Sequence, residues 1–393
     1  MNSSLVFRKG LDLKDAVAAQ LNENYHSDLV EQIKADGFLY RSGRLLIHLA
    51  REFGFCYGVD RAVDYAYQTR ERFPDRRIFL TGEIIHNPHV NDRLRTKGIR
   101  FLTDEGVDTE SLGPEDVIVL PAFGVTTGEM ERFGKLGCVL VDTTCGSVLN
   151  VWKNVKRYAA EDLTSVIHGK VWHEETQATA SQALDEKGGH FLVVLNLEET
   201  EEVCDYIRHG GDKNQFLARF RDAVSPGFDP DRDLQRIGLA NQTTMLMSES
   251  LQVQELFRQA MVDRYGEAGI TARFRAFDTI CSATQDRQDA VVNLLKEQTL
   301  DLMIVIGGYN SSNTCNLARI CAEKVPTFHI ADPECLESAD VIRHRPAGGK
   351  SERRTEQWLP RVGQLSIGLT SGASTPDNQV GATVKRLATL SNQ

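Results

Sequence analysis

Three short stretches of the chain place a cysteine between an apolar run typical of a β-strand and a stretch typical of a helix. They are FGFCYGVDRAV around Cys56, VDTTCGSVLNV around Cys145 and FDTICSATQDRQDAV around Cys281. Each has a small residue two places after the cysteine and a β-branched residue three places after it. Because a parallel sheet gathers functional groups at the carboxyl ends of its strands, we expect the three thiols to converge. Three sulfur ligands around one point suggest iron.

The other cysteines have no such repeated setting, and a lone cysteine is most often a small core residue. Cys138 falls in an apolar strand, and Cys204 and Cys321 fall on helix faces. We predict core positions for these three and for Cys335 and Cys315. No Cys-x-x-Cys pair occurs in the 393 residues, so a secreted disulfide framework is not indicated.

Apolar runs alternate with helical patterns along most of the chain, which predicts an α/β fold of parallel sheets covered by helices. We expect an N-terminal extension with one helix over residues 28–35, and then three α/β domains. A stretch rich in charge, Gly and Pro is interpreted as a surface insertion in the second domain. The predicted boundaries are 1–44 for the extension, 45–137, 138–272 and 273–393 for the domains, and about 209–235 for the insertion.

The charge composition restricts the kinds of molecule that the chain is expected to bind. A formal net charge of −10 and a pI near 5.6 disfavour a general nucleic-acid or anionic-membrane binder. The longest uncharged apolar runs are far shorter than the ~20 residues that a spanning helix needs. The first residues lack an apolar signal core, so we expect a cytoplasmic protein that is not held in a membrane.

Two strand-to-helix steps in the third domain contain loops of Gly, Ser, Asn and Thr. The first is DLMIVIGGYNSSNTC and the second is QLSIGLTSGASTPDN. Free N–H groups at a helix start and short hydroxyl side chains are suited to bind phosphate, although many such loops are only helix caps. Neither loop fits a dinucleotide or P-loop pattern, so a nucleotide is not indicated.

Three further segments carry polar groups directly after predicted strands. EIIHNPHVN contains His86, IHGKVWHEETQAT contains His173 and Glu175, and ANQTTML contains Gln242, Thr243 and Thr244. The His-Glu-x-x-His zinc pattern is absent, and the His-x-Glu of zinc deaminases lacks its Cys-x-x-Cys partner. For either histidine alone, a structural role is as good an interpretation.

Taken in order, eight segments resemble those of the 4-hydroxy-3-methylbut-2-enyl diphosphate reductases, the LytB or IspH family. The resemblance covers the chain from about residue 45 to its end. The extension and the insertion are similar to those of the longer form found in cyanobacteria and plant plastids. The segments are GFCYGVDRA, EIIHNPHV, DTTC, HEET, QTT, DTICSATQDRQ, GGYNSSNT and TSGASTPD.

The resemblance implies a trefoil-like, pseudo-threefold arrangement of three α/β domains around a central 4Fe-4S cluster. Cys56, Cys145 and Cys281 would hold the cluster and leave one iron without a protein ligand. The implied reaction removes the C4 hydroxyl of the small allylic diphosphate and yields isopentenyl and dimethylallyl diphosphate. This is the last step of the methylerythritol phosphate route to isoprenoids. Ferredoxin or flavodoxin is the implied electron donor.

The resemblance also assigns roles to residues. Glu175 is the implied proton source, and Thr243 is implied to hold the substrate hydroxyl and relay the proton. Three more residues, Gln242, Thr244 and Thr284, would complete the shell around the substrate. The implied diphosphate ligands are His86, His173, Ser311, Ser312, Asn313 and Ser374.

The chain departs from the shorter bacterial form at two places. Phe123 stands in the PAFGVT segment where that form has a diphosphate-binding histidine. A hydrogen bond to a charged group contributes roughly 1.5–3 kcal/mol, which a phenyl ring does not supply. The second cysteine is followed by Gly and Ser instead of Pro, which should change the stiffness of the loop more than metal binding.

Other classes of protein remain open from the residues themselves. Zinc could be held by three cysteines and a histidine, which would suit a zinc-dependent hydrolase or a metal-binding protein. Three core cysteines in a sugar-phosphate binding protein would need no metal. An acidic electron donor would need a basic surface, for which Arg93, Arg95, Lys97 and Arg100 or the stretch 341–354 are candidates.

Overall fold

A computed structural model describes residues 5–184, 188–277 and 279–392, and these form two compact units. Unit 1 comprises the start of the chain up to Val6 and Glu110–Cys281. Unit 2 comprises Phe7–Thr109 and Ser282–Gln393. The two-residue strand β1 (Val6–Phe7) lies where the chain passes from the first unit to the second.

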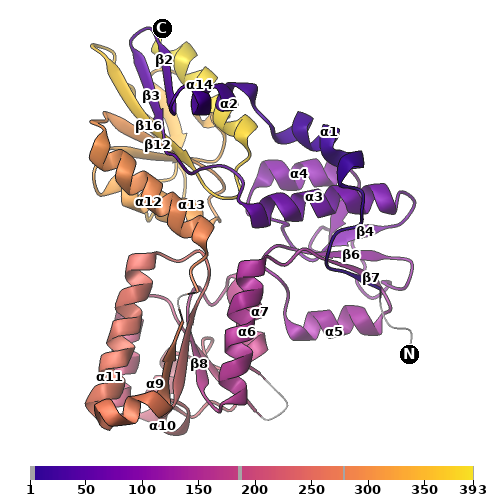
Figure 1. Ribbon diagram of the computed structural model, residues 1–393, viewed down its shortest axis with the longest axis vertical. Helices are drawn as coiled ribbons and strands as arrows, with labels where there is room; N and C mark the ends of the chain where they lie inside the picture. The colour runs from indigo at the N-terminus through magenta and orange to yellow at the C-terminus, as the bar shows by residue number, and fades with distance from the viewer. Residues whose placement is uncertain (1–4, 185–187, 278, 393) are drawn as a thin grey trace. The chain divides into compact units, whose positions relative to one another are not determined.

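Unit 2 is built on a five-stranded sheet that combines strands from both ends of its sequence. The order is β13-β12-β16-β3-β2; the first four strands are parallel and β2 is antiparallel to β3. Apolar side chains on one face pack against α14 and α2, and those on the other face pack against α12 and α13 (Figure 1). The bounds are β2 (Leu39–Ser42), β3 (Leu45–Leu49), β12 (Leu302–Ile306), β13 (Thr327–Ile330), β16 (Leu365–Ser371), α2 (Asp28–Ala35), α12 (Ser282–Glu297), α13 (Ser312–Ala322) and α14 (Asp377–Ser391).

The remaining elements of unit 2 extend from this sheet. Helix α1 packs against α3, and β4 and β5 form a parallel pair. Strands β14 and β15 form an antiparallel hairpin between β13 and β16. The bounds are α1 (Lys14–Tyr25), α3 (Tyr57–Arg72), β4 (Ile78–Leu80), α4 (Pro88–Thr96), β5 (Ile99–Phe101), the 3-10 helix η1 (Pro333–Cys335), β14 (Val341–His344) and β15 (Arg353–Glu356).

Unit 1 contains a parallel strand pair and a four-stranded parallel sheet. The pair is β6 (Val117–Leu120) and β7 (Val139–Asp142), joined through α5 (Thr127–Lys135), which begins with a capping box of Thr126 and Glu129. The sheet has the order β11-β10-β8-β9. Its bounds are β8 (Thr164–His168), β9 (Phe191–Val194), β10 (Ile237–Asn241) and β11 (Phe274–Ala276).

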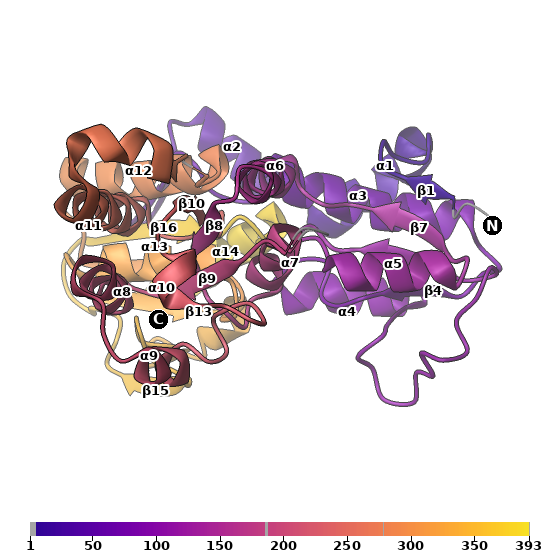
Figure 2. The same ribbon diagram turned by 90° about the horizontal axis from the view of Figure 1, so that it is seen from below.

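Helices cover both faces of this second sheet. On one face α8, α9 and α11 enclose an aromatic and aliphatic core, and Figure 2 shows α8 beside α11. On the other face, valines of α6 and alanines of α7 pack against the strands. The bounds are α6 (Gly146–Ala160), α7 (Glu174–Ala183), α8 (Leu197–His209), α9 (Lys213–Arg219), α10 (Pro230–Asp233) and α11 (Met247–Arg273).

The predicted fold class is confirmed, since the chain is α/β and its larger sheets are parallel apart from the edge strand β2. One strand has an unexpected partner. Strand β3, at the start of the predicted domain 45–137, pairs with β16 from the last part of the chain. The three domain boundaries themselves stay a prediction. Within the described part of the chain, no helix is long and apolar enough to cross a membrane.

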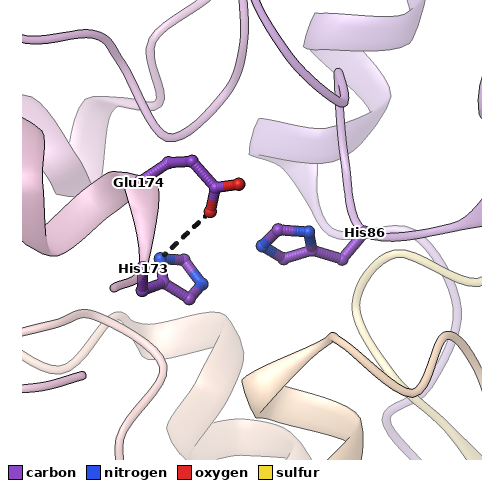
Figure 3. A group of neighbouring side chains, drawn as sticks. All are labelled: His86, His173 and Glu174. Atoms are coloured by element: carbon purple, nitrogen blue, oxygen red, sulfur yellow. Dashed lines mark ion pairs between the residues drawn. The ribbon is translucent and has the colours of Figure 1, made fainter. Parts of the chain in front are cut away.

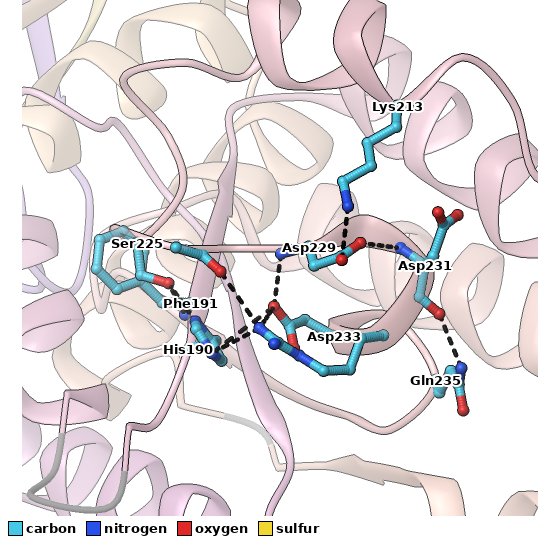
Figure 4. Close-up of polar contacts among 10 residues, drawn as sticks. His190, Phe191, Lys213, Ser225, Asp229, Asp231, Asp233 and Gln235 are labelled. Carbon is cyan, nitrogen blue, oxygen red and sulfur yellow. Dashed lines mark hydrogen bonds and ion pairs between the residues drawn. The ribbon is translucent and has the colours of Figure 1, made fainter.

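The stretch at about 209–235 is more than the surface insertion that its charges suggested. It forms α9 and α10, and its three phenylalanines, Phe216, Phe220 and Phe228, are buried in the core beside the second sheet. Figure 4 shows polar contacts that link Lys213, Ser225 and the residues around α10 with each other and with His190. Lys213 Nζ donates to Asp229 Oδ2 over 2.6 Å, and the Asp229 N–H donates to Asp233 Oδ2 over 2.7 Å. Most of the charges face solvent, Asp233 being a buried exception, while the aromatic rings pack inward.

We predict that Phe216→Ala lowers the free energy of unfolding by roughly 3–5 kcal/mol, the usual cost of removing a buried phenyl ring. Its ring centroid lies 4.8 Å from those of both Tyr206 and Phe220, so a cavity would remain. The measurement is the chemical denaturation midpoint under argon. Gln215→Ala, exposed on the same helix, is the control and should change little. If the two variants had equal denaturation midpoints, Phe216 would not belong to a packed core and the stretch would be a surface insertion after all.

Candidate active site

Each of the three loop cysteines lies at the start of a helix. Cys56 is the N-cap of α3, Cys145 is the N-cap of α6, and Cys281 directly precedes α12. The strand-to-helix placement predicted from the sequence is therefore confirmed. The positive end of a helix dipole favours negative charge on a thiol held there.

The backbone of each cysteine is tied to a second loop of its own unit. The Cys56 N–H donates to the Ala373 carbonyl over 3.2 Å, and the Cys145 N–H donates to the Ala122 carbonyl over 2.9 Å. The Cys281 N–H donates to the Thr243 carbonyl over 3.1 Å. The acceptor loops are TSGAS, PAFG and NQTT. Each cysteine loop is therefore attached to one of the segments discussed in the sequence analysis.

The thiols divide into two groups. All eight cysteines lie in the described part of the chain, and none is in a disulfide. Cys138, Cys204, Cys321 and Cys335 are buried, which confirms the core prediction for these four. Burial raises the pKa of Cys204 to about 12 and raises the pKa values of Cys321 and Cys335, so these thiols stay protonated. Cys315, also predicted as core, is half-buried instead.

The half-buried cysteines at the helix starts, Cys56, Cys145 and Cys281, have the properties of metal ligands. Soft thiolate ligands select iron–sulfur clusters, copper(I) or zinc over hard cations such as magnesium. The chemistry of this donor set therefore fits an iron–sulfur cluster.

In unit 1, the structure brings Glu175 and Thr243 together. The Thr243 N–H donates to Glu175 Oε1 over 2.5 Å, and Thr243 Oγ1 donates to Oε2 over 3.0 Å. Glu175 lies in the first turn of α7 and is 2% exposed. The backbone amide of Thr243 fixes one carboxyl oxygen of Glu175, and the Thr243 hydroxyl lies against the other. This arrangement is suited to transfer a proton from the carboxyl through the hydroxyl.

His173 is the N-cap residue of α7 and is also buried. Its Nδ1 accepts from the Glu175 N–H over 3.1 Å, so the neutral ring carries its proton on Nε2. Glu174 Oε2 lies 3.9 Å from the same Nδ1, the pair dashed in Figure 3. An ion pair there would need a proton on Nδ1 and would break the shorter bond, so we assign the neutral ring.

Phe123 packs edge-on against the His173 ring, with the two centroids 5.7 Å apart and the planes at 78°. The next residue is Gly124 at φ 78°, and a Cβ on it would lie 2.4 Å from Trp152. The turn that presents Phe123 to His173 therefore requires glycine.

Gln242 connects the turn after β8 with the turn after β10. Its Oε1 accepts from the Lys170 N–H over 3.1 Å and from Thr176 Oγ1 over 3.2 Å. Its Nε2 donates to Thr244 Oγ1 over 2.9 Å. Gln242 thus orients Thr244 and fixes the loop that carries Thr243.

In unit 2, the two loops predicted to bind anions meet. Ser311 caps α13 by accepting from the Thr314 N–H, and Ser312 and Asn313 form the first turn. Asn313 Oδ1 accepts from the Ala373 N–H over 3.0 Å, next to Ser374. Asn313 Nδ2 is buried with no hydrogen-bond partner among the described residues, and it offers two donors to a ligand.

His86, drawn in Figure 3, lies beside the first of these loops. Its Nδ1 is 2.9 Å from Glu83 Oε2, which also accepts from Asn310 Nδ2 over 2.6 Å. A Cβ on Gly308 would lie 2.4 Å from the His86 carbonyl oxygen. The close approach of these two segments therefore depends on glycine at 308.

Each unit thus groups its own predicted site residues. Unit 1 joins Glu175, Thr243, His173, Gln242 and Thr244, and unit 2 joins His86, Ser311, Ser312, Asn313 and Ser374. Thr284, predicted to complete the substrate shell, is buried in α12 of unit 2.

Two residues that fix His86 were missed by sequence reasoning. Glu83 lies three places before His86, in the quoted segment EIIHNPHV, and was available as a signal. Asn310 lies in the GGYNSSNT segment, but only its contact with Glu83 across 227 positions of sequence reveals its part.

Comparison with known proteins identifies the family. A family model described as LytB protein matches residues 47–388. A protein of Gloeobacter violaceus named 4-hydroxy-3-methylbut-2-enyl diphosphate reductase is 49% identical, over 99% of this chain and 94% of that protein. A Synechococcus sp. protein of the same name is 50% identical, over 98% of this chain and 93% of that protein.

Solved structures are similar as well. One is described as (E)-4-hydroxy-3-methyl-but-2-enyl diphosphate reductase, the terminal enzyme of the non-mevalonate pathway. It superposes with a TM-score of 0.53 at 26% identity, and the match covers 87% of this chain and 98% of that one. The E-1-hydroxy-2-methyl-but-2-enyl-4-diphosphate reductase of Plasmodium falciparum has a TM-score of 0.61 at 21% identity, with 86% of each chain covered. The second likeness supports the fold alone.

The loop that carries Gln242 and Thr243 is anchored by His168, whose carbonyl accepts from the Gln242 N–H over 2.9 Å. Burial lowers the pKa of the His168 side chain to about 4. Below pH 6.5, His168 therefore becomes protonated in the unfolded chain, whereas in the folded chain it stays neutral until about pH 4. Stability should fall as the pH falls through this window, by up to about 1.4 kcal/mol per pH unit for this residue.

His168→Asn removes the titrating group, and the Asn side chain retains a group able to bond to Ser250 Oγ, 2.9 Å from Nδ1 in the parent. We predict a shallower loss of stability between pH 6.5 and 4 for the variant, measured as denaturation midpoints across that range. Identical pH profiles for variant and parent would show that the pKa of His168 is the same in the folded and the unfolded protein.

Proposed function

Because the chain belongs to the LytB protein family, we infer that it reduces 4-hydroxy-3-methylbut-2-enyl diphosphate, the reaction for which its relatives are named. In this reaction two electrons and two protons replace the C4 hydroxyl, which leaves as water, and the products are isopentenyl and dimethylallyl diphosphate. The observation that carries this function is the family match over nearly the whole chain.

We propose that Cys56, Cys145 and Cys281 hold a 4Fe-4S cluster. Their support is the thiol chemistry described above and their shared position at helix starts. When bound, such a cluster supplies single electrons and one iron that no protein residue holds. The zinc hydrolase is not favoured, because the relatives are named as reductases and zinc supplies no electrons.

Glu175 and Thr243 are proposed to deliver the proton to the leaving hydroxyl. Because Glu175 Oε1 is held by the Thr243 N–H, a proton on the carboxyl lies on Oε2, 3.0 Å from Thr243 Oγ1. Glu175 then donates to Thr243, and Thr243 donates to the substrate oxygen. Protonation turns a poor leaving group into water and lowers the barrier to C–O cleavage.

The diphosphate is proposed to bind to His86, His173, Ser311, Ser312, Asn313 and Ser374. Support comes from the buried, partnerless Nδ2 of Asn313 and from the N-terminus of α13, which attracts anions. Phe123 cannot take this role. We propose that it holds the His173 ring in place through their edge-on contact.

The electron donor is proposed to be a ferredoxin or flavodoxin. Two basic clusters are the candidate docking surfaces, and acidic neighbours compensate part of the charge of each. Arg95 pairs with Asp92 and Asp104. In the second cluster Arg343 pairs with Glu352, and Arg354 pairs with Glu337. The site of docking and a cytoplasmic location stay predictions.

Anaerobic purification with iron and acid-labile sulfide counted per chain tests the proposed function. We expect about four of each, a broad brown absorbance, and turnover of the allylic diphosphate with a one-electron donor. Cys145→Ser should lose iron, colour and activity together. Cys321→Ala, at a buried core thiol, is the control and should keep all three. A colourless protein with one zinc after anaerobic reconstitution would contradict the proposal.

Glu175→Gln tests the proton donor. The amide can accept from the Thr243 N–H as the carboxylate does, so the fold and iron content should persist. We predict that kcat falls by roughly 10²–10⁴-fold, the usual contribution of a general acid. Glu174→Gln, one residue earlier and half-exposed, is the matched control and should turn over normally. Equal kcat values for the two variants would remove Glu175 from this role.

A further inference from the structure

Tyr309 lies in the middle of the loop that leads from β12 into α13, and the reaction as proposed does not use its side chain. The ring meets His329 edge-on, with centroids 4.9 Å apart, and the guanidinium of Arg345 lies 5.0 Å from its centre. Its Oη is 4.0 Å from Cys335 Sγ. Tyr309 is therefore enclosed by residues from β13, the 3-10 helix after it, and the hairpin β14–β15.

The Tyr309 hydroxyl also reaches the hairpin. Burial raises the pKa of Glu352, but hydrogen bonds from Tyr309 and Arg343 outweigh this and lower it. The hydroxyl therefore has an ionised acceptor, and burial together with that bond raises the pKa of Tyr309 itself. The phenol stays protonated and acts as a donor.

Arg345 follows β14 and joins the hairpin to the start of α13. Its N–H donates to the His329 carbonyl over 2.9 Å, and its Nη2 donates to Cys315 Sγ over 2.7 Å. Cys315 Sγ in turn donates to the Tyr309 carbonyl over 3.3 Å. Arg345 therefore contacts Tyr309 in two ways. Its guanidinium lies over the Tyr309 ring, and the Cys315 thiol links it to the Tyr309 carbonyl.

His329 fixes the first residue of the same loop. Burial lowers its pKa to about 4, so the ring is neutral at physiological pH. Its Nε2 lies 2.9 Å from the Gly307 carbonyl, which can only accept, so Nε2 carries the proton. Gly307 sits at φ 145°, and a Cβ there would lie 2.6 Å from Thr375 Oγ1. Both ends of the segment 307–309 are therefore held by residues outside the diphosphate site.

We propose that Arg345 and Tyr309 are positioning residues that hold the loop 307–313 in the shape that binds diphosphate. The inference rests on the proposed function, since Ser311, Ser312 and Asn313 are its diphosphate ligands. A loop that is ordered before binding loses less freedom when the ligand arrives, so preorganisation appears as affinity. The hairpin β14–β15 therefore sets the affinity for the diphosphate end of the substrate and leaves the chemical step unaffected.

The test uses cluster-loaded protein under argon with three readouts: KM and kcat for the allylic diphosphate, and Kd for inorganic diphosphate by calorimetry. For Arg345→Met we expect KM and Kd to rise together by about tenfold, with kcat and iron content within about twofold. Tyr309→Ala should do the same, whereas Tyr309→Phe, which keeps the ring, should be milder. Because the Tyr309 ring acts through its contact with Arg345, the double variant should be no worse than Arg345→Met alone.

Two variants give the controls. Arg354→Gln removes an exposed charge from the same hairpin, where it pairs with Glu337, and should leave KM and Kd unchanged. Ser312→Ala removes a proposed ligand directly and should weaken diphosphate binding. If Arg345→Met does not fold, Cys315→Ala breaks the same path from Arg345 to the Tyr309 carbonyl, and we expect its Kd to rise by about threefold.

The outcomes separate this inference from the proposed function. If Ser312→Ala weakens diphosphate binding and the Arg345 and Cys315 variants do not, the positioning role is wrong and the diphosphate site stands. Additive losses in the double variant, or a fall in kcat at constant Kd, would also overturn the role. If Ser312→Ala itself leaves diphosphate binding unchanged, the proposed site is wrong and this inference falls with it.

Discussion

The arrangement of the site depends on three backbone hydrogen bonds, one from the N–H of each loop cysteine to a carbonyl of another loop. The acceptors are Ala373, Ala122 and Thr243. A buried backbone amide needs a partner, so breaking any of these bonds is costly. Ala373 precedes Ser374, Ala122 precedes Phe123, and Thr243 is itself the proposed proton relay. The position of each thiol is therefore coupled to a proposed diphosphate ligand, to the proposed proton relay, or to the residue proposed to hold the His173 ring.

The polar side chains around these bonds are buried, and a buried polar group destabilises the fold unless it is hydrogen-bonded. Glu175 is satisfied by Thr243, and Gln242 by Lys170, Thr176 and Thr244. Asn313 is one exception, since its amide nitrogen has no partner among the described residues. An unsatisfied donor persists where a ligand supplies the missing acceptor, which is why Asn313 supports a diphosphate site more strongly than the capping serines do.

Local pattern was enough to predict the strands, the helices after them and the cysteines between, because each strand-to-helix step has its own apolar run and start signal. Contacts between distant segments were not predictable. Nothing near β3 indicates that β16 is its neighbour, and the charges of 209–235 obscured the burial of Phe216. The proposed site residues are those that a family motif marks. Arg345 acts through Cys315, thirty positions away, and no local pattern carries that information.

The N-terminal extension and the hairpin β14–β15 both meet the loops of unit 2 that carry proposed diphosphate ligands. From the N-terminal extension, Lys34 of α2 pairs with Asp377 over 2.9 Å, at the start of α14 and three residues after Ser374. From the hairpin, Arg345 reaches the loop before Ser311. A loop of small polar residues buries little apolar surface and cannot order itself. Such a loop needs contacts from other segments, and here the loop after β16 receives them from the N-terminal extension and the loop after β12 receives them from the hairpin.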